Sequence, residues 1–331
     1  MLSQHLLSES HPELFHYTGV DGLEGILRSQ CLWATHWQYL NDAKELDHFA
    51  VVLPQLIKPG RIRLLNERAS QDEHVRSWVN ANGGADLLCE KESQGLALAL
   101  RHSVVNPDPA EQIFEFFVTS LCTAEGAQVG VRTHGLLSQW RYYGKQGGYA
   151  IVLDSCELER LMRLEHDRWK CRLSLGDVAY SDDPPDVLGS RLSDLPVLLR
   201  SIDECQFDSS KSCEPLLNPV LQCFIHYKHW CFAEEREVRL VAVLNGPRMR
   251  ELHQTEGTEW PERQRHYCDG VPRIHLFEGL EVTGRRYRLP IVRILVGPGP
   301  SQRERETKLR ALLDELQFDI PVTLSDMPIR F

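Results

Sequence analysis

The residues best suited to chemistry lie in an acidic segment that runs into an apolar stretch. Glu235 and Glu237 come just before and at the start of residues 238–244, whose β-branched and apolar side chains predict a buried strand. Residues two apart on an extended chain point the same way, so we expect both carboxylates on one face. Such a pair could polarise a sugar hydroxyl or stabilise an oxocarbenium ion. The alternative is a solvated charge cluster, in which Arg236 and Arg239 pair with the acids.

Aromatic and polar side chains elsewhere could complete a nucleotide site. His16 stands beside an expected helix start, where its imidazole could donate to a ribose or a diphosphate, or only bond a backbone carbonyl. Trp140 and Tyr143 lie three residues apart and precede Gly147 and Gly148. That arrangement suits a planar ring stacked over a close backbone turn, although core packing is the commoner use of such aromatics.

Several familiar site motifs do not occur in the sequence. There is no H-E-x-x-H, no G-x-S-x-G and no Rossmann glycine pattern, and residues 297–300 (Gly-Pro-Gly-Pro) predict a turn, because prolines lack the amide donors of a phosphate loop. The ten cysteines form no C-x-x-C pair, and His226, His229 and Cys231 are the nearest approach to a metal cluster. We therefore expect no metal site, and buried reduced thiols instead.

Composition bounds the class of protein. The 331 residues carry a formal net charge of −10 at pH 7, with 42% hydrophobic and 25% charged residues, as in ordinary globular chains. The acidic balance argues against broad electrostatic capture of nucleic acid or of an anionic membrane, though a local basic groove is compatible with it. No apolar run approaches the ~20 residues that span a bilayer, and the N-terminus lacks the pattern of a secretory signal. We expect a cytoplasmic protein that binds no membrane.

Hydrophobic patterning predicts the elements that must position these residues. A helix capped by Thr18 would follow the first strand, a short helix would cover residues 136–143, and turns are expected at 59–60, 82–84 and 106–107. The stretch 246–288 is polar and irregular, and we interpret it as a hairpin or flap. A final strand, helix and strand predict a parallel β-α-β unit. Strands are expected over residues 15–18, 31–35, 116–122, 149–154, 176–181, 238–244, 290–296 and 320–324.

The order of the motifs resembles a large bacterial family of domains of unknown function. Its members typically read H-Y-T, N-D, S-F-S, M-W-x-x-Y, G and E-K-E-W-R, in that order, and the likeness covers nearly the full chain. This sequence departs from the pattern at Gln139 (usually Met), at Val238 (usually Trp), and over residues 119–122, where the family favours S-F-S. The matching residues are His16-Tyr17-Thr18, Asn41-Asp42, Thr119-Ser120, Trp140-x-x-Tyr143 with Gly148, and Glu235-x-Glu237-x-Arg239.

The same order is more remotely similar to the ADP-ribosyltransferase superfamily. This resemblance implies a single α+β domain over residues 1–331, with a split mixed β-sheet core and helical insertions at about 43–115 and 188–224. NAD would be the substrate. Glu237 would be the catalytic glutamate that bonds the ribose 2′-hydroxyl, and Glu235 would orient the acceptor. The residues that would bind NAD are His16, Tyr17, Thr18, Ser120, Trp140 and Tyr143.

The expected function is therefore cleavage of the nicotinamide–ribose bond, as an ADP-ribosyltransferase or NAD glycohydrolase. The acceptor, a protein or a nucleic acid, is left open, and such an activity would suit a toxin or phage-defence effector. One alternative is a non-catalytic module that senses a nucleotide or docks a partner protein through the insertion at 43–115. Another is a hydrolase that uses the acids of residues 234–237, although two-metal nucleases draw their carboxylates from separate elements.

Overall fold

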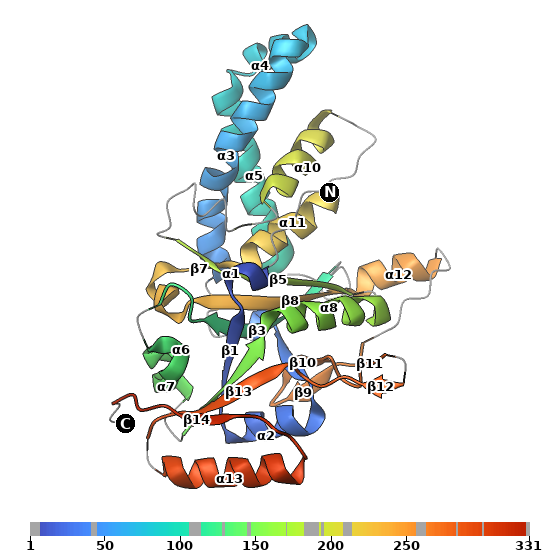
Figure 1. Cartoon of the computed structure of the whole chain (residues 1–331). Helices are drawn as coiled ribbons and strands as arrows, with labels where there is room; N and C mark the ends of the chain where they lie inside the picture. The colour runs from blue at the N-terminus through green and yellow to red at the C-terminus, as the bar shows by residue number, and fades with distance from the viewer. Residues whose placement is uncertain are drawn as a thin grey trace. The chain divides into compact units, whose positions relative to one another are not determined.

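The chain divides into two compact units (Figure 1). The first, here called the sheet unit, comprises residues 1–40, 113–177 and 234–331, and the second, the helical unit, comprises residues 41–112 and 178–233. The two predicted insertions thus make one unit between them, a relation that the sequence did not reveal. The structure, a computed structural model, describes residues 7–40, 45–105, 114–127, 130–143, 147–169, 171–181, 192, 195–207, 214–255, 263–282, 284–299 and 301–328.

A ten-stranded sheet forms the described core of the sheet unit, in the order β14-β13-β4-β1-β3-β2-β10-β9, with β8 paired to β3 and β5 paired to β8. β13 and β14 are parallel across α13, and the other pairs are antiparallel. The expected α+β class and mixed sheet are confirmed. The strands are β1 (Glu13–Thr18), β2 (Leu32–His36), β3 (Phe114–Thr123), β4 (Tyr149–Asp154), β5 (Arg172–Asp177), β8 (Glu237–Asn245), β9 (His266–Cys268), β10 (Val271–Leu276), β13 (Ile291–Val296) and β14 (Val322–Leu324).

The sheet splits at β3. β8 follows one edge of β3 from Phe114 to Cys122. The other edge is shared, since β1 pairs with Cys122 and Thr123, and β2 pairs with Phe117 and Val118. Residues 119–121 therefore lie where β1 and β2 part, and their edge of β3 is open to side chains rather than to a neighbouring strand.

Helices cover both faces of this sheet. Leu23, Ile26 and Leu27 of α2 share one core with Leu158 of α8 and Leu309 of α13, as the helical spacing in α2 predicts. A second core on the opposite face contains Phe15, Tyr17, Cys122 and Trp140, the last from α7. We call this second face the α7 face. The helices of the unit are α1 (Leu7–Ser10), α2 (Val20–Ser29), η1 (Trp37–Tyr39), α6 (Val131–His134), α7 (Leu137–Tyr143), α8 (Ser155–Trp169), α12 (Pro247–Thr255) and α13 (Gln302–Glu315).

The helical unit is built on α3 (Glu45–Gln71), with α4 (Glu73–Ala81), α5 (Ala85–Val105), α10 (Leu195–Phe207) and α11 (Glu214–Ile225). Leu46, Phe49, Leu53 and Ile57 are all buried along α3, at the spacing of one helical face. Two short parallel strands, β6 (Ala179–Tyr180) and β7 (Tyr227–Lys228), complete it. None of the helices in the described ranges is long and apolar enough to cross a membrane.

Four local predictions were wrong. α3 continues through Pro59, so no turn lies there, because burial of its apolar stripe offsets the hydrogen bonds that proline removes. The strand expected over 176–181 is divided at Val178 between β5 and β6. Thr18 does not cap α2, whose N-cap is Gly19 with no side-chain bond. The sequence also predicts a loop over residues 125–132, but the short helix α6 begins within it at Val131.

Other predictions hold or lie outside the described residues. The turn at 82–84 is confirmed, and β9 and β10 form the hairpin expected within 246–288. That stretch is not irregular throughout, because α12 forms over Pro247–Thr255. A second hairpin joins β11 (Glu281–Val282) to β12 (Arg285–Arg286). The Asn41-Asp42 motif and the turn at 106–107 lie outside the described residues.

Candidate functional site

Three polar side chains meet on the α7 face of the sheet, where it splits. Ser120 of β3 is directly opposite Arg239 of β8, and Cys122 is opposite Glu237. Alternation along the strands puts Ser120, Arg239 and Glu237 on the same face as Cys122, which belongs to the α7-face core. Two of the residues predicted from sequence, Ser120 and Glu237, are thus brought together by register.

Glu237 lies at the centre of this group. Its Oε1 accepts a hydrogen bond from the Ser120 hydroxyl at 2.6 Å and another from Arg239 Nε at 2.9 Å, while its Oε2 lies 3.2 Å from Arg239 Nη2. Glu237 is 4% exposed and Arg239 is 2% exposed, whereas Ser120 is exposed. The Glu237–Arg239 ion pair is therefore buried, whereas Ser120, which is bonded to it, is accessible to a ligand from solvent. The pairing of Arg239 with an acid is the one that the sequence suggested.

His16 crosses the split in the sheet. The pairing of β1 with β3 ends at Phe15, the residue before His16. The Nδ1 atom of His16 lies 3.2 Å from the carbonyl oxygen of Ser120. A carbonyl only accepts, so Nδ1 carries the proton and Nε2 keeps its lone pair. Burial lowers the pKa of His16, and the Ser120 carbonyl opposes this only in part. The imidazole is thus neutral at pH 7, with an acceptor nitrogen available for a hydroxyl.

Tyr17 and Trp140 support the site from within the core. Their rings meet edge to face with centroids 4.9 Å apart, and both are buried. The Tyr17 hydroxyl accepts a bond from the Leu136 amide at 2.7 Å, and Trp140 Nε1 donates to the His134 carbonyl at 2.6 Å. In this arrangement both residues hold α7 against the sheet, and neither ring presents a face on which a nicotinamide could stack.

Tyr143, at the end of α7, is placed differently. It is 37% exposed and its ring packs against Tyr142. Burial raises its pKa above the ordinary value, and the nearby charges of Glu235 and Glu237 raise it further. The Tyr143 hydroxyl therefore stays protonated beside the acidic group, as a donor.

Glu235 and Glu237 do not share one extended strand, so that expectation was wrong. Glu235 ends the 3-10 helix η3 (Trp230–Glu235), and β8 begins at Glu237. Between them Arg236 has a φ of 48°, a left-handed conformation that breaks the two-residue alternation. Its guanidinium donates to the carbonyls of Glu125 and Gly126 rather than to an acid. Glu235 is half-buried and lies at the end of η3 rather than on β8.

Thr18 lies at the end of β1, opposite Tyr149 of β4. A side chain at Gly22 would collide with its hydroxyl, and a side chain at Gly148 would meet the carbonyls of Tyr143 and Thr18. The predicted close turn at Gly148 is therefore present, and it lets α7, β1 and β4 approach one another. Thr18 has a packing role here, rather than the capping role expected from sequence.

A pocket of about 920 Å³ lies elsewhere in the sheet unit, and none of the predicted site residues lines it. Arg28 is paired there with Glu24 and Glu315, and Arg160 with Glu157 and the Tyr287 hydroxyl. Internal partners thus satisfy much of its positive charge. Its lining residues are Leu27, Arg28, Gln30, Arg160, Arg286, Tyr287, Arg288, Leu316 and Phe318.

The sequence missed one cluster of ionisable side chains. Within the described ranges His266, His275 and Glu278 are the group of histidines, cysteines and acids that lies close enough to hold a metal ion. The group expected to come nearest does not assemble: His226 Nδ1 contacts the Gln222 carbonyl, whereas His229 Nδ1 contacts Cys231 Sγ. The histidines of the observed cluster are not close in sequence, because the hairpin of β9 and β10 brings them together. A search for short ligand spacings therefore does not find them.

Comparison of the chain with protein-family models, with curated proteins and with solved structures gave no match.

Proposed function

We propose that this protein binds NAD and cleaves its nicotinamide–ribose bond, as an ADP-ribosyltransferase or an NAD glycohydrolase. The observation that carries the proposal is the Glu237 carboxylate, held by the Ser120 hydroxyl and Arg239, while the Ser120 carbonyl binds His16 where β1 and β3 part. These residues come from three strands and from distant parts of the sequence. Among them, the resemblance to ADP-ribosyltransferases assigns His16 to the ribose, Ser120 to the pocket and Glu237 to catalysis.

The chemistry needs a fixed negative charge more than a strong nucleophile. Loss of nicotinamide leaves positive charge on the ribose C1′ and ring oxygen, so an adjacent carboxylate stabilises the transition state. Glu237 would accept a hydrogen bond from the ribose 2′-hydroxyl, while Ser120 and Arg239 fix its orientation. Neutral His16 would accept a bond from another hydroxyl of NAD through Nε2, at the opening between β1 and β3. The Tyr143 hydroxyl would donate at the open side of the site.

The acceptor stays the open part of the proposal. Glu235 would orient it, as the resemblance implies, and water, a protein side chain or a nucleic-acid base would each fit the chemistry. The net charge of −10 favours a protein over a nucleic acid. A partner protein would dock through the insertion at 43–115. Cleavage of cellular NAD or modification of a target would make the protein a toxin or a phage-defence effector.

A second function is favoured by one specific observation. Both carboxylate oxygens of Glu237 contact the guanidinium of Arg239, and both side chains are almost completely buried. A glutamate engaged in this way could serve the fold alone. The protein would then be a nucleotide-sensing or partner-binding module on the same scaffold, which binds NAD or a related nucleotide without turnover.

Nicotinamide release from NAD tests these alternatives. We expect release by the wild type, and a 10²–10³-fold lower rate in Glu237→Gln, because one preorganised electrostatic contact to the transition state typically contributes that factor. The matched control is Glu234→Gln, which removes the same charge from an exposed acid of the same segment and should leave the rate unchanged. Circular dichroism would establish that each variant is folded.

Three outcomes separate the proposals. Unchanged release by a folded Glu237→Gln variant contradicts the assignment of the catalytic glutamate. Saturable NAD binding without release from the wild type supports the sensing module. If the wild type neither releases nicotinamide nor binds NAD in isothermal titration calorimetry, both proposals are wrong.

A further inference from the structure

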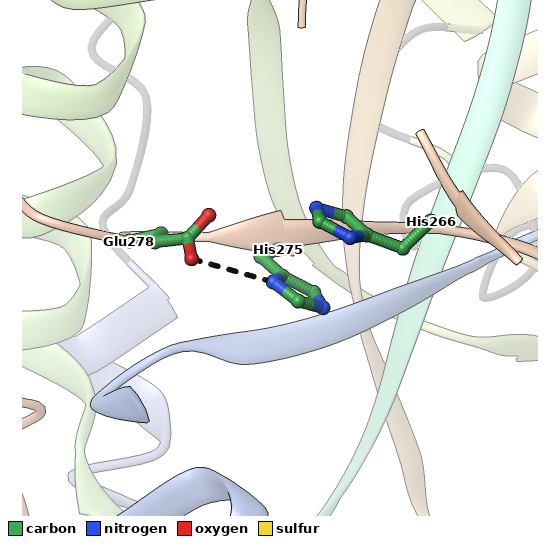
Figure 2. Close-up of side chains that lie close together, drawn as sticks. All are labelled: His266, His275 and Glu278. Carbon is green, nitrogen blue, oxygen red and sulfur yellow. Dashed lines mark ion pairs between the residues drawn. The ribbon is translucent and has the colours of Figure 1, made fainter. Parts of the chain in front are cut away.

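The hairpin of β9 and β10 brings together two histidines and a glutamate (Figure 2). His266 opens β9 and is paired with Arg273 of β10, two residues before His275, so both imidazoles lie on the same face of the hairpin. Glu278 follows in the turn after β10, where Phe277 has a φ of 68°. Its carboxylate points at the near nitrogen of His275 in Figure 2.

His275 is held firmly between two rings. The Trp33 ring lies on one side with centroids 5.5 Å apart and planes 11° from parallel, and the His266 ring lies on the other at 3.9 Å and 4°. Its Nδ1 is buried and makes no hydrogen bond. The stack on Trp33 fixes the plane of the His275 imidazole, and its buried Nδ1 faces the Glu278 carboxylate at 3.6 Å, too far for a hydrogen bond. A buried polar atom without a hydrogen bond costs free energy, so a metal ion between these two groups would be favourable.

We propose that His266, His275 and Glu278 bind a divalent transition metal ion, with zinc the best fit to two imidazoles and one carboxylate. His275 Nδ1 and Glu278 Oε1 lie 3.6 Å apart. Two ligands at tetrahedral angles around zinc, with bonds of about 2.0–2.2 Å, are roughly 3.3–3.5 Å apart, so these atoms need almost no movement to share an ion. Nitrogen donors favour zinc and its neighbours over magnesium or calcium.

His266 must turn to become the third ligand. The lone pair of an imidazole lies in the plane of its ring, and these two rings are stacked in parallel planes, so one ion cannot lie in both planes. The rotation needed is small, because the three ligand atoms already lie within 4.8 Å of one another. β9 is the last strand in the sheet order, so the His266 side chain can rotate without displacing a neighbouring strand. Three protein ligands leave a fourth position for water.

Nearby charges set the expected strength. Arg263 donates to the His275 carbonyl and forms an ion pair with Glu165 at 2.5 Å, so its charge is balanced. Arg273 lies over the Trp33 ring at 5.4 Å and remains a positive neighbour. We therefore expect weaker binding than in closed four-ligand zinc sites, with Glu278 supplying the compensating negative charge.

Titration of the metal-free full chain with ZnCl₂ in a calorimeter tests the site. We expect one saturable event per chain, and binding at least tenfold weaker in His266→Gln and in Glu278→Gln, because even second-shell losses cost about 10–100-fold. Two controls should bind as the wild type does: His229→Gln, which removes the histidine beside Cys231, and Cys268→Ser, which removes the exposed thiol of β9. Excess zinc should also raise Tm in the wild type and not in Glu278→Gln.

Substitution with Co²⁺ identifies the ligands without any mutation. Intense visible absorption without a near-ultraviolet thiolate band supports four-coordinate binding by nitrogen and oxygen. A thiolate band, equal affinity in the wild type and in folded Glu278→Gln, or no saturable zinc binding by the wild type overturns the proposal. None of these results depends on nicotinamide release, so the two proposals stand or fall separately.

Discussion

Two buried pairs of arginine and carboxylate, one from each unit, differ in what they join. In the helical unit, Arg61 of α3 donates to Asp203 of α10 at 3.0 Å and to Glu92 of α5 at 3.3 Å. Arg68 of α3 binds the second oxygen of Asp203 at 2.7 Å. This network ties three helices together. In the sheet unit, Glu237 and Arg239 are two residues apart on the same strand, β8, so the ion pair between them does not connect separate elements.

The difference indicates which pair the fold needs. Helices pack through side chains alone, so an ion pair between them fixes their relative position. β8 is held by backbone hydrogen bonds to both β3 and β5, with or without Glu237. A buried pair also costs desolvation free energy that a hydrophobic pair would avoid. A local pair that adjoins an exposed serine is more readily explained by a function.

The largest effect on stability is expected for Asp203→Asn. The substitution removes the charge that two arginines share, and Arg61 has only 1% of its side chain exposed. Loss of one partner from a buried ion pair typically costs about 3–5 kcal/mol. Urea unfolding measures the loss, and hydrogen exchange should localise it to α3, α5 and α10. Asp47→Asn, which affects an exposed pair with Arg101, is the control and should leave the unfolding midpoint unchanged. If the unfolding midpoint of Asp203→Asn were also unchanged, Asp203 would not stabilise the helical unit.

Glu237→Gln should cost less, although the chemical change is the same. The amide oxygen still accepts from the Ser120 hydroxyl and from Arg239 Nε, and the β8 ladder is untouched. The amide nitrogen cannot accept from Arg239 Nη2, so we expect a loss of about 1.5–3 kcal/mol. Hydrogen exchange in β3 and β5 should match the wild type. If Glu237→Gln unfolded as readily as Asp203→Asn, the contrast between the two pairs would fail and the pair on β8 would be structural.

The sequence predicted the strands of this site well and its local geometry poorly. The run from Val238 to Leu244 is buried throughout, so its apolar character was a reliable signal. The left-handed Arg236 could not be foreseen, because non-glycine residues seldom adopt that conformation. Ser120 meets Glu237 because of the register between β3 and β8. The resemblance gave the order of the motifs along the chain but not this register.

Elsewhere the misses have different causes. α8 went unpredicted although Leu158, Leu161 and Met162 have helical spacing, because the rest of the helix is strongly polar. α3 runs through two prolines because tertiary packing overrides local propensity. The pairing of His266 with His275 is set by a hairpin register, and nothing in the spacing of nine residues indicates it.

Glu13 extends the comparison to a pair within the sheet unit that does join separate elements. This residue of β1 binds Arg293 of β13 at 2.6 Å and Arg132 of α6 at 2.9 Å. Burial alone would raise the pKa of Glu13, but the hydrogen bonds and charges of both arginines outweigh it and hold the pKa at about 2. If joining elements is what makes a pair stabilising, Glu13 should behave like Asp203.

We expect acid to remove this contribution. Because the folded pKa is lower than the unfolded one, the stability that Glu13 provides is complete above about pH 4.5 and is lost as the pH falls towards 2. After allowance for Arg132, which is 62% exposed, it amounts to about 2 kcal/mol. Urea unfolding from pH 6 to pH 2 should show a steeper loss in the wild type than in Glu13→Gln. Parallel curves would contradict the prediction.

The smallest effects should come from two neighbouring hydroxyls on opposite faces of β3. Ser120 donates to Glu237, whereas Thr119 donates to the Trp33 carbonyl at 3.0 Å, on the edge shared with β2. Ser120→Ala should lower nicotinamide release about five- to tenfold, equivalent to one hydrogen bond of ~1 kcal/mol, with little change in unfolding. Thr119→Val should do the reverse, with about 1 kcal/mol less stability and an unchanged rate. If both variants lost the same stability and Ser120→Ala kept the wild-type rate, the Ser120 hydroxyl would have a structural role like that of Thr119. The α7 face would then have no catalytic role at this position.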